Sequence, residues 1–345
     1  MPVLALTISV VATIVSVAIV LTLRRYLRRI DRQMRRNLDA DLKTLDAELR
    51  HIQTKQDLAL RQMQMMQITL GRLAFQANPT VQFLAQALRQ GSPVTDRETS
   101  YSITRLINNI EINWPVESSS DVVICAVALG TEYREIVRPC LDSHKKYAQQ
   151  HGYRYAVLER PPSYPERPHP WLKLLLILRL FQDGAKKVFY IDADAMITNT
   201  EISLDAYFAK FEHEADIFLT EDEGGINSGL MFAVNTVGAR RIFELIWLYD
   251  ADLDHDNWEQ NAFKIIMNDF SEVRRKVLIE PRPKSFNSFP LERRLFHKTR
   301  DENIWTAGDF ICHFSGIRSP ELERYVRDYA KGLSYLVVAS DATKG

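Results

Sequence analysis

Two carboxylates stand at the end of an apolar stretch in the middle of the chain. The stretch KKVFYIDAD ends with Asp192 and Asp194, one residue apart. Two like charges so close together repel each other, and a bound cation would relieve that repulsion. Mg²⁺ and Mn²⁺ prefer oxygen ligands and often complete their coordination with substrate phosphates. Taken alone, the pair fits a metal site and a simple turn equally well, because aspartate is also frequent in turns and helix caps.

The surrounding sequence predicts an α/β fold in which this pair ends a strand. Runs of β-branched and aromatic residues alternate with segments of helical period, which is typical of a sheet with parallel crossovers. The predicted strands cover residues 121–129, 153–159, 186–192, 215–220 and 229–235, and the predicted helices cover residues 132–152, 171–184 and 238–252. Pro139 is expected to kink or split the first helix. Ligands of such sheets collect beyond the carboxyl ends of the strands, where the two aspartates lie.

Composition indicates a folded chain with a large core. The 345 residues are 46% apolar, and the formal net charge is zero. No overall field therefore favours nucleic acid as a partner. The three cysteines, Cys125, Cys140 and Cys312, show no CxxC or Cys/His spacing, which argues against a disulfide framework and a zinc site.

An uncharged run, Val3–Leu23, lies near the start of the chain. At about 1.5 Å per residue it is long enough for the roughly 30 Å hydrocarbon core of a bilayer, so it predicts a transmembrane anchor. A cleaved signal peptide is the alternative, but no basic residue precedes the run and seven arginines crowd residues 23–37 behind it. Because cytoplasmic flanks collect basic residues, this bias favours a cytoplasmic location for the rest of the chain.

Apolar residues then recur at alternating spacings of four and three. The series is Leu38, Leu42, Leu45, Leu49, Ile52, Gln56, Ala59, Met63, Met66, Leu70 and Leu73. Such a heptad seam predicts a coiled-coil stalk and hence a homo-oligomer, with the polar Gln56 helping to fix the register. A single amphipathic helix lying on its own catalytic domain is the alternative.

These patterns together predict five regions. They are a transmembrane anchor at residues 1–23, a helical or coiled-coil stalk at 24–93, a helical linker at 94–120, a catalytic α/β domain at 121–335 and a tail at 336–345.

Seven short motifs resemble, in the same order, those of one glycosyltransferase family. It contains the fungal Golgi α-mannosyl- and α-galactosyltransferases and the plant xyloglucan xylosyltransferases. The matching pieces are HGYRYAV at 151, WLK at 171, IDADAMITN at 191, GGINSGLMFAVNT at 224, WEQNAF at 258, FNSFP at 286 and GDFICHFSG at 308. The ordered set is far more specific than any one motif, and it covers roughly residues 121–318.

The resemblance implies a GT-A fold, a Rossmann-like architecture for nucleotide-diphospho-sugar transferases. It also implies a UDP- or GDP-sugar donor, a glycan acceptor, a bound Mn²⁺ or Mg²⁺ and retention of the anomeric configuration. Asp192 and Asp194 match the family's metal-binding motif, and His313 matches its third metal ligand. Without the motif, His313 would be interpreted as a core histidine.

The resemblance further implies a set of residues that bind the donor. Asn227–Gly229 matches a loop that contacts the donor sugar, and Lys173 and Arg318 are candidates for the diphosphate, where fixed cations would stabilise the departing negative charge. For Lys173, a solvated position on a helix is the alternative. The donor-binding candidates are Gly130, Tyr133, Lys173, Asn227, Ser228, Gly229 and Arg318.

The motif WEQ supplies the implied catalytic residues, Glu259 and Gln260. Retention requires either a carboxylate nucleophile beneath the anomeric carbon or same-face attack through a short-lived oxocarbenium ion. Gln260 matches the family residue near the β-face of the sugar, and because an amide is a poor nucleophile, same-face attack is favoured. Glu259 would bind hydroxyls of the donor or acceptor, unless it only supplies negative charge at a helix N-terminus. Asn287 is a candidate for the acceptor side.

The sequence leaves alternatives open for the side of the membrane on which the catalytic domain lies and for the activity of the protein. The family is usually found in the Golgi lumen, whereas the charge bias, the odd number of cysteines and the lack of an Asn-x-Ser/Thr sequon slightly favour the cytoplasmic face. An inactive membrane-tethered oligomeric scaffold would lose its metal ligands, yet Asp192, Asp194 and His313 are all present. Another metal-dependent nucleotide enzyme, such as a nucleotidyltransferase, usually carries a Gly-rich basic phosphate loop, and none follows DVVICAVALG.

Overall fold

The structure is a computed structural model that describes residues 2–90, 97–162, 167–253 and 255–342. Within these ranges, the side chains of residues 2–21, 27, 30–42, 44, 97–102 and 333–342 are outside the described part. The chain divides into two units, Met1–Ile68 and Thr69–Gly345.

The first unit is part of one long helix, α1 (Pro2–Ala77), which continues into the second unit. The residues predicted to form the stalk are thus helical up to Ala77, and their role as a stalk stays a prediction. In the first unit the described large apolar side chains of the heptad seam are 50–68% exposed, and they are Leu45, Leu49, Ile52, Met63 and Met66. Pairing of this seam with other copies stays a prediction.

The predicted anchor, Val3–Leu23, falls almost entirely on residues whose side chains are outside the described part. Among the described residues, no helix is both long enough and apolar enough to cross a bilayer. The anchor therefore stays a prediction.

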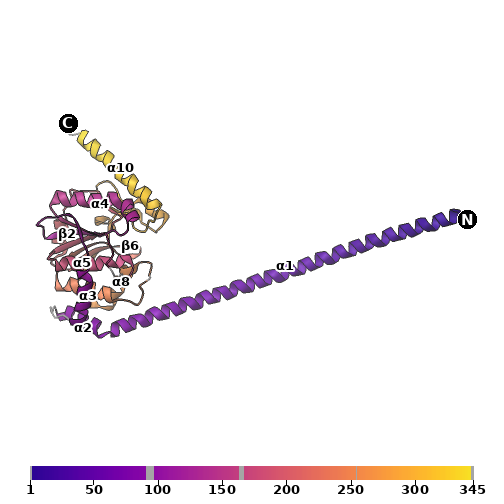
Figure 1. The fold of residues 1–345 in the computed structure, drawn as a ribbon, viewed down its shortest axis with the longest axis horizontal. Helices are drawn as coiled ribbons and strands as arrows, with labels where there is room; N and C mark the ends of the chain where they lie inside the picture. The colour runs from indigo at the N-terminus through magenta and orange to yellow at the C-terminus, as the bar shows by residue number, and fades with distance from the viewer. Residues whose placement is uncertain (1, 91–96, 163–166, 254, 343–345) are drawn as a thin grey trace. The chain divides into compact units, whose positions relative to one another are not determined.

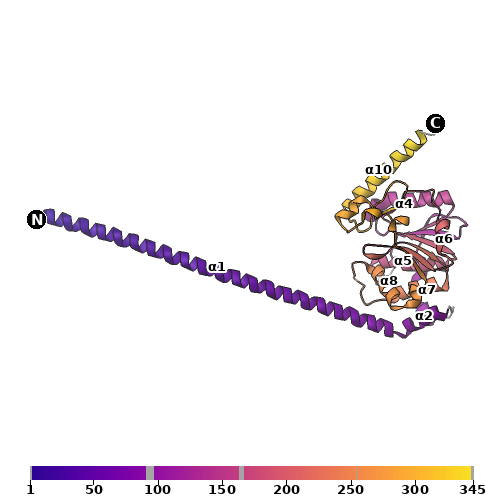
Figure 2. The same cartoon turned by 180° about the vertical axis from the view of Figure 1, so that it is seen from behind.

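The second unit is built on a seven-stranded sheet with helices on both faces (Figures 1 and 2). The strand order is β1-β3-β2-β4-β7-β6-β8. The strands are β1 (Asn113–Val116), β2 (Val122–Val127), β3 (Arg154–Leu158), β4 (Lys187–Ile191), β6 (Ile217–Asp222), β7 (Gly225–Val234) and β8 (Val277–Glu280). A separate two-stranded sheet pairs β5 (Ala195–Ile197) with β9 (Ile311–His313).

All five predicted strands are confirmed, but the sheet is mixed rather than parallel throughout. Strands β3, β2 and β4 are parallel, whereas β7 is antiparallel to both of its neighbours, β4 and β6. The reason is the short link between β6 and β7, in which Asp222 already pairs with Gly225. A turn this short can join only antiparallel strands, because a parallel pair needs a crossover of a dozen residues or more.

The helices form two layers, each with its own hydrophobic core. One face carries α2 (Pro79–Gln90), α3 (Arg97–Asn108), α5 (Leu172–Gln182), α7 (Val237–Leu248) and α8 (Trp258–Asp269), and the other carries α4 (Thr131–His151), α6 (Leu204–Phe211) and the start of α10 (Glu321–Ala342). The remaining short helices are α9 (Ser271–Arg274), η1 (His169–Trp171), η2 (Pro283–Ser285), η3 (Leu291–Leu295) and η4 (Asp301–Asn303). Pro139 lies within α4 and does not split it; it removes only one backbone donor from a helix of 21 residues.

The compact α/β unit begins well before the predicted boundary at residue 121. The end of α1 and helix α2 both contribute to its core, since Phe75 packs edge-on against Tyr249, with 5.2 Å between ring centres, and Val81 and Leu84 are almost fully buried. Strand β1 then adds an edge to the sheet. The pattern of α2 alone does not distinguish a stalk helix from a helix packed on the domain, so the prediction placed this boundary too late. The predicted boundary between stalk and linker, 93–94, lies outside the described residues.

Candidate active site

The three predicted metal ligands meet because of a short strand pair. Asp192 directly follows β4, and Asp194 directly precedes β5. In the antiparallel pair of β5 and β9, Ala195 is opposite His313. The pairing therefore brings the distant histidine to the carboxyl end of β4, where the two aspartates lie.

The side chains of Asp192, Asp194 and His313 form one compact group. The Nε2 atom of His313 is 3.5 Å from Asp194 Oδ1 and 3.8 Å from Asp192 Oδ2. One possible ligand atom from each residue lies within 4.8 Å of the other two. Two carboxylates and an imidazole suit a cation such as Mn²⁺, which prefers oxygen and tolerates nitrogen.

Buried Asn287 orients His313 in this group. Its side-chain oxygen accepts a hydrogen bond of 2.9 Å from Nδ1 of His313, and its amide donates to Thr220 Oγ1 at 3.0 Å. Because the amide oxygen can only accept, Nδ1 carries a proton, and Nε2 is the nitrogen that faces the carboxylates and can bind a cation once it is deprotonated. Asn287 is fully buried and both of its side-chain groups are bonded within the protein, and its role towards an acceptor stays a prediction.

Gly229 leaves room beside the three ligands. Its backbone oxygen accepts a hydrogen bond of 2.8 Å from the Asp192 backbone N–H. A Cβ atom at position 229 would overlap both His313 and Asp192. Any larger residue would thus fill the space that a cation and its ligands need, and the residues present fit a divalent cation.

The electrostatics of the group agree with this interpretation. Burial works to raise the pKa of Asp194, but the hydrogen bond and the charge of His313 outweigh it and hold the pKa below its ordinary value. Tyr133, at the start of α4, faces the same carboxylates: burial, followed by Asp194 and Asp192, raises the pKa of its phenol well above the usual value. Asp194 is thus kept ionised, as metal binding requires.

Lys173 lies beneath the aspartates rather than in solvent. Its ammonium is 2.8 Å from Glu259 Oε1 and 3.4 Å from Asp192 Oδ1, and only 4% of the residue is exposed. Burial lowers the pKa of Lys173, but Asp192 and Glu259 outweigh this effect and raise it overall. The alternative of a solvated helix residue is therefore wrong. The structure shows Lys173 bound to protein carboxylates, and its contact with a diphosphate stays a prediction.

The WEQ motif meets the predicted donor-sugar loop, Asn227–Gly229, which the structure places within strand β7 rather than in a loop. Gln260 Oε1 accepts a hydrogen bond of 2.9 Å from the Ser228 N–H, and Ser228 Oγ donates to Glu259 Oε1 at 2.8 Å. Gln260 is half-buried, whereas Glu259 is buried within the first turn of α8. The loop, the metal ligands and the two implied catalytic residues therefore form one continuous site.

Two predicted residues lie at the edges of this cluster. Gly130 starts α4 with a φ of 83°, and Arg318 is exposed, five residues after His313. Within the described part of the chain, no hydrogen bond or ion pair joins either of them to the group. Their contacts with a nucleotide stay predictions.

Two polar residues of the site carried no motif. Tyr190 donates a hydrogen bond of 2.7 Å to Asp192 Oδ1, and its ring lies 4.8 Å from the ammonium of Lys173. The period of two along a strand places Tyr190 and Asp192 on the same side, so this contact was accessible to sequence reasoning. Arg293, described below, had no such signal.

Comparison with known proteins points to one class, the glycosyltransferases. Residues 118–213 match the sequence model of the galactosyl transferase GMA12/MNN10 family. The resemblance predicted from the motifs is thereby confirmed over this part of the chain, which includes Lys173, Asp192 and Asp194.

Similar individual proteins belong to the same class. An uncharacterized alpha-1,2-galactosyltransferase of Schizosaccharomyces pombe is 30% identical over 93 residues, which span 25% of this chain and only 24% of that protein. Among solved structures, a glycosyltransferase involved in the glycosylation of the major capsid of PBCV-1 has a TM-score of 0.46 and 13% identity, covering 60% of this chain and 98% of its own. Mouse xyloside xylosyltransferase 1 in its apo form has a TM-score of 0.37 and 10% identity, covering 56% and 98% respectively.

Proposed function

We propose that the protein is a metal-dependent, retaining glycosyltransferase that moves a hexosyl or pentosyl unit from a nucleotide sugar to a glycan hydroxyl. The observation that carries the proposal is the convergence of Asp192, Asp194 and His313, with Gly229 leaving space beside them. The family match over residues 118–213 supports transfer of a sugar. Together they favour an active enzyme over an inactive scaffold.

Each part of the site has a task in this proposal. Asp192, Asp194 and His313 would hold the cation, which supplies positive charge against the diphosphate as it leaves. Tyr190 and Lys173 orient Asp192 through the hydrogen bond and the ion pair described above. Arg318, exposed at the end of the loop after His313, would add a second cation for the diphosphate.

The WEQ motif supports same-face attack in this proposal. Gln260 has an amide rather than a carboxylate, and its oxygen is already bonded to the Ser228 N–H. Glu259, the nearest carboxylate in the motif, is buried and paired with Lys173. Because neither residue presents a free nucleophile, the acceptor hydroxyl would attack on the face that the diphosphate leaves, with the amide dipole of Gln260 stabilising positive charge on the sugar.

The activity is tested with the purified full chain in detergent, Mn²⁺ and a panel of UDP- and GDP-sugars. Release of free nucleoside diphosphate together with a glycosylated product is expected. Asp194→Asn should lower the rate by about 100-fold or more, because a catalytic cation contributes several kcal/mol. The matched control is Asp183→Asn, an exposed aspartate paired with Arg179 away from the site, and it should leave the rate unchanged.

The other outcomes contradict the proposal. Release of pyrophosphate would indicate nucleotidyl transfer, and absence of any nucleotide-sugar or Mn²⁺ binding would favour a scaffold. An inverted anomeric configuration in the product would overturn the retaining mechanism while leaving sugar transfer intact.

We further propose that Val3–Leu23 anchors the enzyme in a membrane, with the catalytic unit on the cytoplasmic face and the stalk joining several copies. The exposed heptad seam in α1 and the arginines after the apolar run support this arrangement. Protease treatment of intact vesicles should remove the C-terminus, whereas protection would place the catalytic unit in the lumen. Replacement of Leu45 and Leu49 by asparagine should convert an oligomer to a monomer in light scattering.

A further inference from the structure

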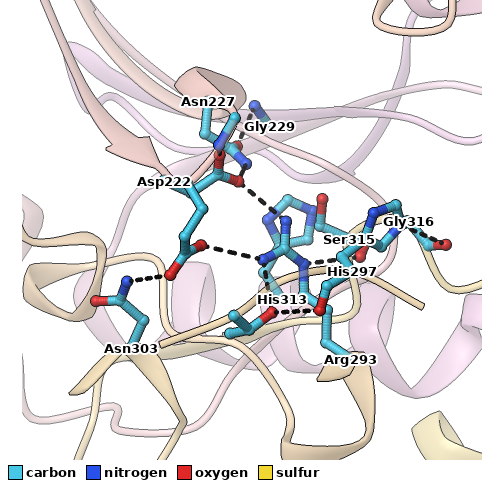
Figure 3. A network of polar contacts seen from close by, with 12 residues as sticks. Asp222, Asn227, Gly229, Arg293, His297, Asn303, His313, Ser315 and Gly316 are labelled. Atoms are coloured by element: carbon cyan, nitrogen blue, oxygen red, sulfur yellow. Dashed lines mark hydrogen bonds and ion pairs between the residues drawn. The ribbon is translucent and has the colours of Figure 1, made fainter. Parts of the chain in front are cut away.

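Arg293 occupies a buried position beside the site that no motif predicted. It lies in the short helix η3, is 6% exposed, and its guanidinium stacks 4.0 Å from the centre of the Phe289 ring. Figure 3 shows the guanidinium between Asp222 on one side and the loop after His313 on the other. A buried cation requires partners that offset its desolvation, and here they come from both sides.

A chain of hydrogen bonds connects the guanidinium of Arg293 to Asp192. Arg293 Nη2 donates to Asp222 Oδ2 at 3.0 Å, and the same oxygen accepts from Asn227 Nδ2 at 3.1 Å. Asn227 Oδ1 then accepts from the Gly229 N–H at 3.0 Å. The Gly229 oxygen accepts from the Asp192 N–H. The predicted donor-sugar loop is therefore linked step by step to both the guanidinium and a metal ligand.

The other side of Arg293 leads to His313. Arg293 Nε donates a hydrogen bond of 3.2 Å to the backbone oxygen of Ser315, two residues after His313. The Phe289 ring beneath the guanidinium has its centre 6.1 Å from that of the His313 ring. A third donor, Nη1, bonds Thr299 Oγ1 at 3.1 Å and fixes the plane of the guanidinium.

These contacts need the shape of arginine as well as its charge. Three nitrogens of one planar group donate in three directions, to a carboxylate, a carbonyl and a hydroxyl. Lysine has a compact ammonium without that fixed fork, so it can satisfy the charge of Asp222 but not all three partners at once.

We propose that Arg293 is a positioning residue that sets the spacing between the predicted donor-sugar segment of strand β7, Asn227–Gly229, and the His313 strand. The inference rests on the proposed function, since it concerns the geometry of the same site. Arg293 contacts none of the three metal ligands through its side chain. It acts through Asn227 and Gly229 on one side and through Ser315 and Phe289 on the other. The backbone of Gly229 already lies so close to His313 and Asp192 that an added Cβ atom would overlap both. A small shift of Asn227–Gly229 would therefore close or distort the group of candidate ligands.

Amide hydrogen exchange tests this inference without relying on activity. In the purified full chain, Arg293→Met should speed exchange about tenfold or more at the amides of Asp192 and Gly229 and in residues 311–316, because the bonds that hold them lose their anchor. In parallel, electron paramagnetic resonance titration with Mn²⁺ should show the dissociation constant rising about 10- to 100-fold, as is typical when residues that orient metal ligands are lost.

Two further variants keep the test decisive if Arg293→Met folds poorly. Arg293→Lys retains the charge and should show an intermediate effect on both measurements. Asp222→Asn should loosen the donor-sugar loop but leave Ser315 bonded, so exchange should rise at Gly229 and not at residues 311–316. The matched control is Arg241→Met, which removes another buried arginine, paired with Glu244 in α7, and should change neither measurement at the site.

The outcomes separate the inference from the proposed function. Unchanged exchange at Gly229 and at residues 311–316 in both Arg293 variants would overturn the positioning role, whatever the enzyme does. If the unaltered protein binds no Mn²⁺, the proposed function fails, and the exchange comparison still decides whether Arg293 positions the two segments.

Discussion

Two buried cations support the candidate site from different sides, and they do so in different ways. Lys173 contacts a candidate metal ligand directly, with its ammonium between Asp192 and Glu259. Arg293 has no hydrogen bond or ion pair with the candidate ligands and instead links the end of β6, at Asp222, to the segment after His313, at Ser315. Lys173 offsets the negative charge of the two carboxylates, whereas Arg293 fixes the distance between the two segments that it joins. The acidic cluster therefore depends both on the nearby positive charge of Lys173 and on the more distant hydrogen bonds of Arg293.

The difference predicts that Lys173 matters more for stability and Arg293 more for geometry. Removing Lys173 leaves the buried Glu259 and the partly exposed Asp192 without their cation, and a buried ion pair broken in this way typically costs about 3–5 kcal/mol. Removing Arg293 leaves Asp222 still bonded to Asn227 and to the Gly224 N–H.

Lys173→Met should lower the free energy of unfolding by about 3–5 kcal/mol, because Asp192 and Glu259 lose their shared partner. Urea denaturation of the purified chain measures this loss. Adding Glu259→Gln to the variant should recover part of it, since one uncompensated charge is then removed.

A control separates this effect from the general loss of a lysine. Lys276 pairs with Asp216 away from the site and is one-third exposed, so Lys276→Met should cost about 1 kcal/mol or less. Equal losses for the two lysine variants would contradict the role given to Lys173.

His144→Gln tests how a buried, uncharged histidine near Asp194 makes stability depend on pH. His144 Nε2 lies 2.7 Å from the Ala195 backbone oxygen, and its Nδ1 lies 3.2 Å from the Tyr155 hydroxyl. Burial lowers the pKa of His144 from 6.5 to about 4. The neutral imidazole thus contributes stability that is complete above pH 6.5 and is lost as the pH falls towards 4, because the unfolded chain takes up a proton that the folded chain refuses.

The size of this effect follows from the pKa difference. Between pH 6.5 and pH 5 the folded protein should lose about 2 kcal/mol of unfolding free energy through His144, and His144→Gln should lack that loss. Urea denaturation at pH 7, 6 and 5 measures the slope. His213→Gln, at an exposed histidine, is the control and should keep the slope of the unaltered protein.

Asn287→Ala should weaken metal binding about 10- to 100-fold, equivalent to about 1.4–2.7 kcal/mol, because His313 Nδ1 loses its acceptor and the ring is free to turn. Titration with Mn²⁺ followed by electron paramagnetic resonance measures the change. Asn235→Ala removes an equal side chain that bonds backbone oxygens of Phe181 and Ala185 far from the site, and it should leave the affinity as it was. Unchanged affinity for Asn287→Ala would show that His313 does not need this partner.

Much of the fold could be predicted because its strands are continuous apolar runs. The segments around β2, β4 and β7 are β-branched or aromatic and are bounded by polar residues or glycine, so their positions follow from the sequence. The direction of β7 did not follow, because it depends on the two-residue turn after Asp222. Strands β5 and β9 have three residues each and no pattern of their own.

The residues of the site likewise fall into those that the sequence predicted and those that it did not. Asp192, Asp194, Ser228 and Gln260 are carried by motifs, and the structure brings them together. The roles of Lys173 and Asn287 could not be predicted, since both depend on which side chains pack around them. The sequence did not indicate that Lys173 lies between two carboxylates or that Asn287 is buried behind His313 and accepts its hydrogen bond.

Three features could be identified along the chain without the structure: an α/β pattern after a long helix, an acidic pair at the end of a strand, and motifs that resemble those of a glycosyltransferase family. These properties depend on local periodicity and on short ordered motifs, which can be identified along the chain. Three features depend on three-dimensional packing: β9 brings His313 to the acidic pair, Lys173 lies beneath that pair, and Arg293 links the end of β6 to the segment after His313. Those contacts link segments far apart in sequence, and side-chain packing rather than local preference selects them.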